Sequence, residues 1–257
     1  MMSVLDRFRL DGRRALVTGG GTGIGKGLAQ ALAEAGADVA VCGRTQDTLE
    51  RTVAEVESRG ARAKAIHADV TSADDVRAAV QSVVDEWGSL DIAVNNAGIT
   101  TWVDAVDMPE DDWDRVLDTN LKGVFLCSQE AARVMIPQGR GAIVNVASIS
   151  AQIINRPQQQ AHYSASKAGV VHLTRALAAE WAEHGVRVNA VSPGYTRTEM
   201  VNAPHMIPAR PIWTRDTPMG RMAEIEEIQG AVVFLASDAA AYVTGHDLVV
   251  DGGVTAW

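Results

Sequence analysis

Hydrophobic residues along the chain form two kinds of pattern, short continuous apolar runs and longer segments with helical spacing. Continuous apolar runs bounded by turn residues are typical of strands that are buried on both faces of a sheet. They occupy residues 14–18, 39–42, 63–68, 90–94, 142–146, 186–191 and 248–250. Helical spacing covers about residues 26–35, 46–59, 73–87, 110–135, 161–184 and 224–236.

The two patterns alternate along the chain, and this alternation predicts the fold class. Strands that alternate with helices form βαβ units with right-handed crossovers and a parallel sheet. We therefore expect an α/β fold of the Rossmann type, doubly wound, with a mainly seven-stranded parallel sheet and helices on both faces. No repeat or linker interrupts the alternation, so residues 1–257 are expected to form one domain. Residues from about 199 to 220 carry several prolines and little periodicity, which favours a substrate loop.

Composition and charge argue against several classes of protein. The 257 residues carry a net charge of −9 and no basic run, which argues against a nucleic-acid surface. No stretch is apolar for long enough to span a bilayer, and the N-terminal segment lacks the apolar core of a signal peptide. Cys42 and Cys127, like His67, His162 and His172, show no metal-ligand spacing. We expect a cytoplasmic protein with no metal and no membrane or nucleic-acid partner.

A glycine-rich turn follows the first apolar run and precedes the first helical segment. Its sequence is Gly19-Gly-Gly-Thr-Gly-Ile-Gly25. Glycines let the chain bend tightly and bring backbone N–H groups close to a pyrophosphate, while the helix N-terminus supplies partial positive charge. Between a strand and a helix, the turn predicts nucleotide binding, the alternative being a flexible turn. The turns after the other strands are expected to gather at the same sheet edge, where ligands of such folds bind.

Tyr163 and Lys167 are the strongest catalytic candidates by spacing. They are four residues apart in a predicted helix and therefore share one face. A free phenol has a pKa near 10, and a neighbouring positive charge lowers that pKa. The pair would let Tyr163 act as an acid–base catalyst near neutral pH. The alternative is a half-buried tyrosine one turn away from a solvated lysine.

Taken in order, these motifs resemble those of the short-chain dehydrogenase/reductase family along nearly the whole chain. The resemblance rests on Thr18-Gly19 with Gly23 and Gly25, Asp69, Asn95-Asn96-Ala97-Gly98, the set Asn120, Ser148, Tyr163 and Lys167, and Pro193-Gly194 with Thr196 and Thr198. It implies an NAD(P)-dependent oxidoreductase that interconverts a secondary alcohol and a ketone. The cofactor-binding residues that it implies are Gly19, Thr22, Gly23, Ile24, Gly25, Arg44, Asp69, Val70, Asn96, Ala97, Gly98, Tyr163, Lys167, Pro193, Gly194, Thr196 and Thr198.

The resemblance also implies a catalytic tetrad of Asn120, Ser148, Tyr163 and Lys167. Tyr163 would exchange a proton with the reacting oxygen, and Ser148 would hydrogen-bond and orient it. Lys167 would lower the phenol pKa and hold the nicotinamide ribose, and Asn120 would anchor a water in a proton relay to Lys167. Ser148 lies two residues further from Tyr163 than is commonest in the family, and Ser150 would restore that spacing. We prefer Ser148, because it directly follows a predicted strand and leaves Ser150 to face the substrate.

The end of the second predicted strand bears on the choice of cofactor. A carboxylate there usually binds the adenine-ribose 2′-hydroxyl. This chain has Gly43 at that position, and the next residue, Arg44, could pair with a 2′-phosphate. We therefore expect NADP, with NAD as the alternative. Thr22 counts against this expectation, because many NADP-preferring relatives have a basic residue at its position.

The loop between Ser148 and Tyr163 is enlarged and polar, and it resembles that of family members acting on polyols and sugars. Its hydroxyl and amide groups can pair with several hydroxyls of a small-molecule substrate. The expected substrate-binding residues are Ser148, Ser150, Gln152, Asn155 and Tyr163. Asn155 is the strongest candidate among them, the alternative being that it only caps the backbone of its own loop.

Two other functions remain open at this point. One is a 3-oxoacyl-thioester reductase, which the apolar Met200, Met206 and Ile207 favour and the polar residues 155–160 argue against. The other is a nucleotide-binding sensor without turnover, against which the complete tetrad speaks.

The helical segments 110–135 and 161–184 bear on assembly. They carry more apolar residues than one buried face needs. In the resembled family such helices pair across subunit interfaces, which implies a homotetramer with two-fold symmetry.

Overall fold

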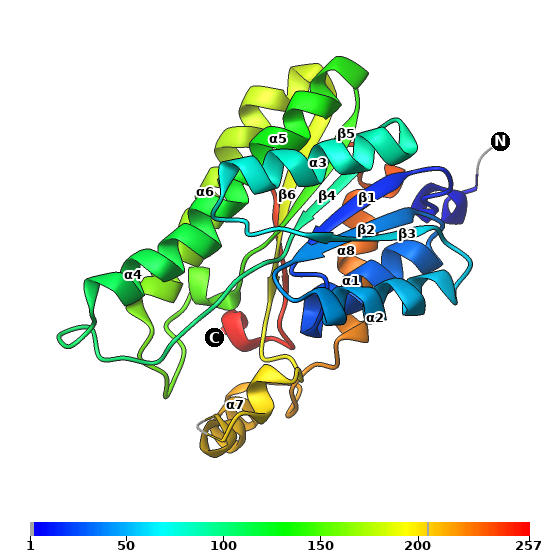
Figure 1. The fold of residues 1–257 in the computed structure, drawn as a ribbon. Helices are drawn as coiled ribbons and strands as arrows, with labels where there is room; N and C mark the ends of the chain where they lie inside the picture. The colour runs from blue at the N-terminus through cyan, green and yellow to red at the C-terminus, as the bar shows by residue number, and fades with distance from the viewer. Residues whose placement is uncertain (1–2, 205) are drawn as a thin grey trace.

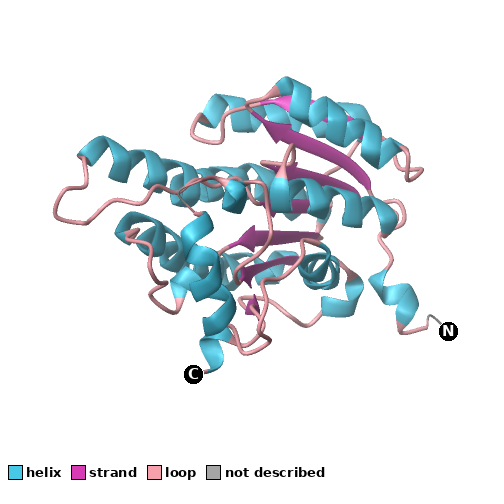
Figure 2. Ribbon diagram, turned by 90° about the horizontal axis from the view of Figure 1, so that it is seen from below, coloured by secondary structure: helices cyan, strands magenta, loops and turns pink. Residues whose placement is uncertain are grey.

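A computed structural model describes residues 3–204 and 206–257, and it contains one parallel sheet. The strands are β1 (Arg14–Thr18), β2 (Asp38–Gly43), β3 (Ala63–His67), β4 (Ile92–Asn95), β5 (Gly141–Val146), β6 (Val186–Pro193) and β7 (Asp247–Val250). They lie in the order β3-β2-β1-β4-β5-β6-β7, and all neighbouring strands are parallel. Their arrowheads accordingly point the same way in Figure 2. The predicted doubly wound, seven-stranded fold is confirmed.

Helices cover both faces of this sheet (Figure 1). One face is covered by α1 (Gly23–Glu34), α2 (Gln46–Glu57) and α8 (Glu226–Ala236), and the other by α3 (Ala73–Trp87), α5 (Gly123–Gln138) and α6 (Ala161–Trp181). Each face has its own hydrophobic core. Within β2, Val39 and Val41 pack in the core under α1, α2 and α8, while Ala40 and Cys42 pack in the core under α3, α5 and α6. Because both faces are buried, the strands read as continuous apolar runs. None of the helices in the described residues combines the length and apolarity needed to span a membrane.

The segment predicted as one helix over residues 110–135 is interrupted. It consists of α4 (Glu110–Leu117), a π-helical turn over Asp118–Lys122, and α5. A single π-turn inside an α-helix is short, and hydrophobic spacing read over the whole segment does not separate it from the α-helices on either side. The predicted end before Pro137 was also wrong, because α5 runs through this proline to Gln138. One missing N–H donor in the last helical turn is tolerated, and Gly139, with φ of 65°, ends the helix.

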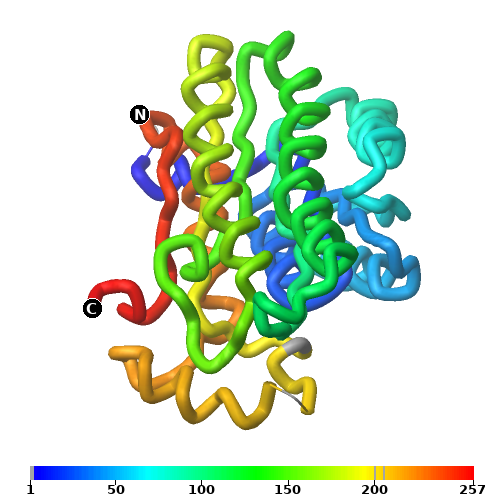
Figure 3. Tube along the Cα trace, turned by 90° about the vertical axis from the view of Figure 1, so that its left-hand side faces the viewer, coloured from blue at the N-terminus to red at the C-terminus, as the bar shows by residue number. Residues whose placement is uncertain are grey.

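The segment predicted to be irregular, 199–220, carries short helices. They are 3₁₀ turns at Met200–Asn202 and Ile207–Ala209, followed by α7 (Arg210–Asp216). Prolines occupy the first positions of the last two, where a missing N–H costs little. The segment packs on a small apolar cluster of its own around Trp213 and runs across the lower end of the molecule in Figure 3, below the adjacent α5 and α6. The segment is therefore less irregular than its lack of periodicity indicated, because its prolines lie in the first turns of short helices.

Candidate active site

The glycine turn between β1 and α1 is held by the loop that follows β4. The hydroxyl oxygen of Thr18 accepts the N–H groups of Asn96 and Ala97, both at 3.0 Å. The Asn96 amide donates in return to the carbonyl oxygens of Thr18 at 3.0 Å and Gly19 at 3.2 Å. Gly19 has φ of 63°, and a Cβ on Gly25 would lie 2.2 Å from the Gly19 carbonyl oxygen. Glycine is therefore required at both positions, and the turn is a rigid cradle rather than a flexible loop.

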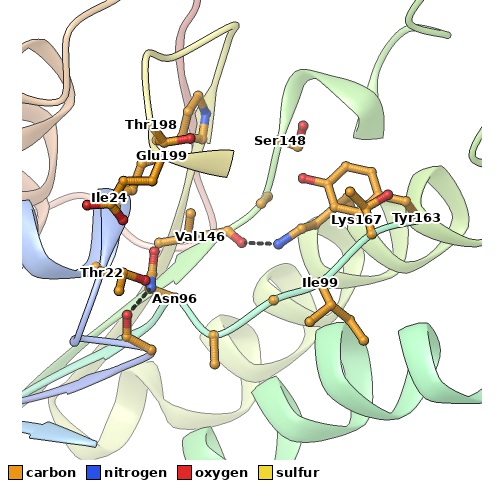
Figure 4. A pocket seen from close by; sticks show the side chains of 18 of the residues that line it. Thr22, Ile24, Asn96, Ile99, Val146, Ser148, Tyr163, Lys167, Thr198 and Glu199 are labelled. Carbon is orange, nitrogen blue, oxygen red and sulfur yellow. Dashed lines mark hydrogen bonds between the residues drawn. The ribbon is translucent and has the colours of Figure 1, made fainter. Parts of the chain in front are cut away.

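A cleft of about 320 Å³ opens above this turn at the carboxyl ends of the strands. This volume lies within the usual range for small-molecule sites. Figure 4 shows Thr22 and Ile24 of the glycine turn on one side, and Ser148, Tyr163 and Lys167 on the other. The predicted cofactor residues that line the cleft are Gly19, Thr22, Gly23, Ile24, Gly25, Asn96, Ala97, Gly98, Tyr163, Lys167, Pro193, Gly194 and Thr198.

Four predicted cofactor residues lie outside the described lining of the cleft. Arg44 is exposed beyond β2, with its guanidinium 4.0 Å from the carboxylate of Asp69. Asp69 accepts hydrogen bonds from the main chain and hydroxyl of Thr71 at 2.9 and 2.8 Å. Val70 is buried in an apolar cluster, and the Thr196 hydroxyl bonds within its own turn. The predicted contacts of these four residues with the cofactor therefore stay predictions.

Sequence reasoning missed some residues that line the cleft. Most are direct neighbours of the motifs, and their proximity to Gly98, Ser148 and Thr198 was the available signal. They are Ile99, Thr100, Val146, Ala147 and Glu199.

Lys167 lies deep beside the cleft and is tied to the sheet. It is 3% exposed, and its Nζ donates to the carbonyl oxygen of Val146 at 2.7 Å. Burial without a carboxylate partner lowers its pKa to about 8. Its Nζ lies 5.7 Å from the centroid of the Tyr163 ring. The ammonium is thus near the phenol, as the spacing predicted.

The expected lowering of the Tyr163 pKa is not borne out. Burial of the phenol raises the pKa of Tyr163, and a hydrogen bond with Ser148 only partly opposes this. The physical reason is that the free-energy cost of removing the phenolate from water exceeds its stabilisation by the nearby groups. A raised pKa favours the protonated phenol, so Tyr163 suits the role of a proton donor beside Ser148.

Asn120 lies in the π-turn and is fully buried. Its side-chain oxygen accepts the N–H of Ile99 at 2.8 Å, and its amide donates to the Ile99 carbonyl at 2.9 Å and the Ser166 hydroxyl at 3.1 Å. A Cβ on Gly98 would come within 3.3 Å of the Asn120 oxygen and 3.6 Å of Lys167 Nζ. Asn120 thus fixes the loop against α6, and the missing side chain of Gly98 leaves space between Asn120 and Lys167.

Three of the residues predicted to bind the substrate form hydrogen bonds with other side chains of the protein: Ser150, Gln152 and Asn155. Ser150 and Asn155 are buried, are hydrogen-bonded to each other, and lie outside the described lining of the cleft. The amide of Gln152 donates to Asp247 at 2.9 Å on an exposed part of the surface. The alternative for Asn155, a cap on its own backbone, is not what the structure has either, because both of its partners are side chains: Ser150 and Tyr195.

His162, next to Tyr163, has a structural role. It is fully buried, its Nδ1 accepts the N–H of Tyr163 at 2.9 Å, and its Nε2 bonds the Thr101 hydroxyl at 2.8 Å. Burial lowers its pKa, which favours the neutral ring. Across the described residues, no group of three or more His, Cys, Asp or Glu side chains is arranged to hold a metal ion.

Comparison with known proteins identifies the family. Residues 19–255 match the family model described as enoyl-(acyl carrier protein) reductase. Galactitol 2-dehydrogenase from Rhizobium johnstonii is 49% identical over 100% of both chains. A solved short-chain type dehydrogenase/reductase from Mycobacterium marinum is 50% identical, covers 98% of this chain and 99% of its own, and has a TM-score of 0.96.

The chain belongs to the short-chain dehydrogenase/reductase family. It is therefore an NAD(P)-dependent oxidoreductase acting on CH–OH groups, and the hypothesis of a sensor without turnover is not retained. A gluconate 5-dehydrogenase from Burkholderia cenocepacia, solved with NADP and tartrate, is 39% identical over 99% of this chain and all of its own, with a TM-score of 0.92.

The residues present fit a dinucleotide cofactor. The glycine turn at the N-terminus of α1 leaves no room for a Cβ at Gly25 and presents backbone N–H groups suited to a pyrophosphate. Lys167 and Tyr163 face this turn across the cleft (Figure 4), and Pro193 at the end of β6 and the following Gly194 also line it. A nicotinamide held on that side would lie beside Ser148 and Tyr163, where a carbonyl or hydroxyl group of a substrate can reach both.

Proposed function

We propose that this protein is an NADP-dependent dehydrogenase that interconverts an alditol and its ketose. The main support is the pairing of Ser148 with Tyr163 at the cleft, in a chain 49% identical along its full length to a galactitol 2-dehydrogenase. The gluconate 5-dehydrogenase relative, solved with a polyhydroxylated acid, adds support for a hydroxyl-rich substrate.

The chemistry follows from the two side chains at the cleft. When bound, the nicotinamide supplies or accepts the hydride. In reduction, the protonated Tyr163 donates its proton to the carbonyl oxygen as negative charge develops there. Ser148 hydrogen-bonds the same oxygen and holds it in line. In oxidation, the phenolate of Tyr163 accepts the proton of the alcohol, and the buried ammonium of Lys167 stabilises that phenolate.

The preference for NADP rests on the groups just beyond β2. Arg44 places an exposed guanidinium there, next to Thr45 and the N-terminus of α2. Thr45 is the N-cap residue of this helix, so its hydroxyl lies at the helix N-terminus. A guanidinium, a hydroxyl and a helix N-terminus together suit a phosphate better than a 2′-hydroxyl.

A 3-oxoacyl-thioester reductase is the second candidate. The matching family model carries an acyl-carrier-protein description, and the apolar cluster of Met206, Trp213 and Met222 adjoins the loop between Ser148 and Tyr163, where the Trp213 indole donates to the carbonyl oxygen of Arg156. An acyl chain would suit such a surface. The similarity to galactitol 2-dehydrogenase along the full chain favours the alditol.

Initial rates decide between the two candidates. Galactitol and other alditols, the matching ketoses and 3-oxoacyl thioesters are each assayed with NADP(H) and NAD(H). We expect the highest kcat/KM for an alditol–ketose pair with NADP(H). A higher value for a 3-oxoacyl thioester would overturn the substrate assignment, and a higher value with NAD(H) would overturn the cofactor assignment.

We also propose a homotetramer in the cytoplasm. Trp113 on α4 and Phe125 on α5 are 41% and 37% exposed, which leaves apolar surface on the segment expected to pair between subunits. The buried, unpaired Cys42 and Cys127 suit a reducing compartment. Sedimentation of a monomer at micromolar concentration would contradict the assembly, and recovery in a membrane fraction would contradict the location.

A further inference from the structure

The main chain of Tyr163 is held by side chains at both its N–H and its carbonyl group. The ring nitrogen Nδ1 of His162 accepts the Tyr163 N–H at 2.9 Å, and the Ser166 hydroxyl donates to the Tyr163 carbonyl oxygen at 2.7 Å. The first N–H groups of a helix have no partner within the helix, so they need acceptors from outside. Gln160, the N-cap residue of α6, forms no side-chain capping bond in the described structure. The His162 ring therefore acts as the cap of the turn that carries Tyr163.

The other ring nitrogen of His162 connects the same turn to the lining of the cleft. Nε2 lies 2.8 Å from the Thr101 hydroxyl. Thr101 directly follows Ile99 and Thr100, which both line the cleft. One fully buried ring thus joins the start of α6, and with it Tyr163, to a second segment of the site.

These two contacts determine where the ring proton lies. A main-chain N–H can only donate, so Nδ1 accepts and carries no hydrogen atom. The neutral ring then has its proton on Nε2 and donates it to the Thr101 hydroxyl. A protonated ring would carry a hydrogen atom on Nδ1 as well, and that donor would face the Tyr163 N–H. Protonation of His162 is therefore incompatible with the bond that holds Tyr163.

The surroundings of His162 favour the neutral ring. Burial lowers its pKa, whereas the main-chain oxygen of Gln160 and the carboxylate of Asp112 on α4 act in the opposite direction. Arg115, also on α4, is ion-paired with Asp112 and lowers the pKa of His162 further. Burial is the largest of these effects, so the pKa of the ring lies below its ordinary value of 6.5. The bond to Tyr163 is thus intact at neutral pH and is lost in acid.

We propose that His162 is a positioning residue for proton transfer, whose neutral ring fixes the main chain of Tyr163 to the segment 99–101 of the cleft. It acts through Tyr163, so its loss should lower kcat. This inference rests on the acid–base role of Tyr163 in the proposed function, but not on the alditol as substrate.

The pH dependence of carbonyl reduction separates His162 from the catalytic groups. The pKa of Tyr163 is raised above 10 and that of Lys167 is about 8, so both side chains stay protonated as the pH falls from 6.5 to 5. A protonated Tyr163 is also the form that reduction needs. A fall in kcat in this range therefore reports a different group, and protonation of His162 predicts such a fall.

Initial rates of the parent and of His162→Asn test this role between pH 7.5 and pH 5.0. The substrate is whichever carbonyl compound the enzyme reduces fastest, and NADPH is saturating, so that titration of its 2′-phosphate does not enter kcat. We expect the parent kcat to fall about tenfold across this range. The asparagine side-chain oxygen can take the place of Nδ1 and does not titrate. His162→Asn should therefore stay within threefold of the parent at pH 7.5 and change less than twofold down to pH 5.0.

Three further variants separate the two contacts of the ring. His162→Leu has no acceptor, so its kcat should be about tenfold below the parent at pH 7.5 and should not depend on pH. Thr101→Val removes the partner of Nε2 but keeps the ring, so the fall in acid should remain. His172→Asn replaces an exposed histidine of the same helix and is the matched control, with kcat within twofold of the parent at every pH.

A second measurement does not depend on turnover. The unfolded chain binds a proton near pH 6.5 that the buried ring does not, so the stability contributed by His162 falls as the pH drops below 6.5. The difference in Tm between the parent and His162→Asn should therefore shrink from pH 7.5 to pH 5.0. A difference that stays constant would contradict a neutral, buried ring.

Two kinetic results would also overturn the inference. An equal fall in kcat for the parent and His162→Asn, or no fall in the parent, would mean that the titration of His162 does not control Tyr163. A parent-like kcat of His162→Leu at pH 7.5 would mean that the acceptor is not needed. Because any reducible carbonyl compound serves, a failure of the alditol assignment leaves these outcomes readable. A failure of the acid–base role itself would appear separately, as turnover in Tyr163→Phe.

Discussion

The two sides of the cleft are built by different means. On the side of β1 and β4, main-chain groups and glycines form the surface, and one amide, Asn96, fixes the turn through main-chain oxygens. On the side of β5 and β6, the side chains of Ser148, Tyr163 and Lys167 form the surface. Outside the lining, Ser150 contacts Ser148 and also pairs with Asn155, which bonds Tyr195. A substitution that adds a carbon atom to the first side should therefore impair cofactor binding. A substitution that removes a single proton or hydrogen bond from the second side should instead impair turnover or substrate binding.

The largest effect is expected from Tyr163→Phe, on the side of the cleft next to β5 and β6. Phenylalanine keeps the ring in its half-buried position but has no proton to transfer, so kcat should fall about a thousandfold. The dissociation constant of NADPH should stay within threefold of the parent, because the glycine turn is unchanged. Stopped-flow rates and fluorescence titration measure the two quantities. Turnover within tenfold of the parent would remove Tyr163 as the acid–base residue.

Lys167 provides a prediction for the pH dependence of stability. Its pKa is about 8 in the folded protein against 10.5 for an ordinary lysine, so between these values the unfolded chain binds more protons. The free energy of unfolding contributed by this group therefore rises with pH across that window, by about 3 kcal/mol. Urea unfolding of the parent and of Lys167→Met at several pH values isolates the effect. A difference between the two proteins that does not change from pH 8 to 10.5 would contradict the burial of an unpaired ammonium.

On the main-chain side, Gly25→Ala should cost about 1–3 kcal/mol of stability. The added Cβ would lie 2.2 Å from the Gly19 carbonyl oxygen and 2.3 Å from the Asn96 amide, neither of which can move freely. We expect a lower Tm and at least tenfold weaker binding of NADP. Gly230→Ala in α8 is the matched control, since a Cβ there meets no heavy atom of the described chain within 4 Å. Its Tm should stay the same or rise.

Arg44→Ala should have a smaller and selective effect. Loss of the guanidinium should raise the KM for NADP about tenfold, or about 1.4 kcal/mol, and leave the KM for NAD within twofold. Arg62→Ala removes an equal charge just before β3, at the opposite end of the sheet, and should change neither KM. Equal losses with both cofactors in Arg44→Ala would mean that Arg44 does not contact a 2′-phosphate.

The same contrast explains how much could be predicted from the sequence. The positions of Gly19, Gly25 and Asn96 follow from local requirements: a tight turn after a strand, and an amide at the end of the next strand. Such requirements depend on consecutive residues, so the parallel, doubly wound fold and the glycine turn of the cleft could be predicted, whereas the order of the strands was not. Tyr163 and Lys167 could be placed for a similar reason, because one helix sets their spacing.

The partners of Asn155 could not be predicted in this way. Its side chain meets Tyr195, which is 40 residues away, and its loop meets Trp213, which comes from α7. The sequence shows that the loop is rich in amides, but only the packing of three segments determines whether those amides face a ligand or one another. The raised pKa of Tyr163 was missed for the same reason, because desolvation depends on everything packed around the phenol.

The smallest effect is expected from Trp213→Phe, which tests how the short helix α7 is connected to the substrate loop. The indole N–H donates to the carbonyl oxygen of Arg156 and to the side-chain oxygen of Gln158, both at 3.1 Å. Phenylalanine can keep the stacking on Tyr195 but loses this donor, and one such bond contributes about 1 kcal/mol. If the loop shapes the substrate end of the cleft, the substrate KM should rise about fivefold, while kcat and the cofactor KM change less than twofold. A change in the cofactor KM alone would mean that α7 acts on the glycine-turn side of the cleft. That result would contradict the assignment of cofactor binding and substrate binding to separate sides.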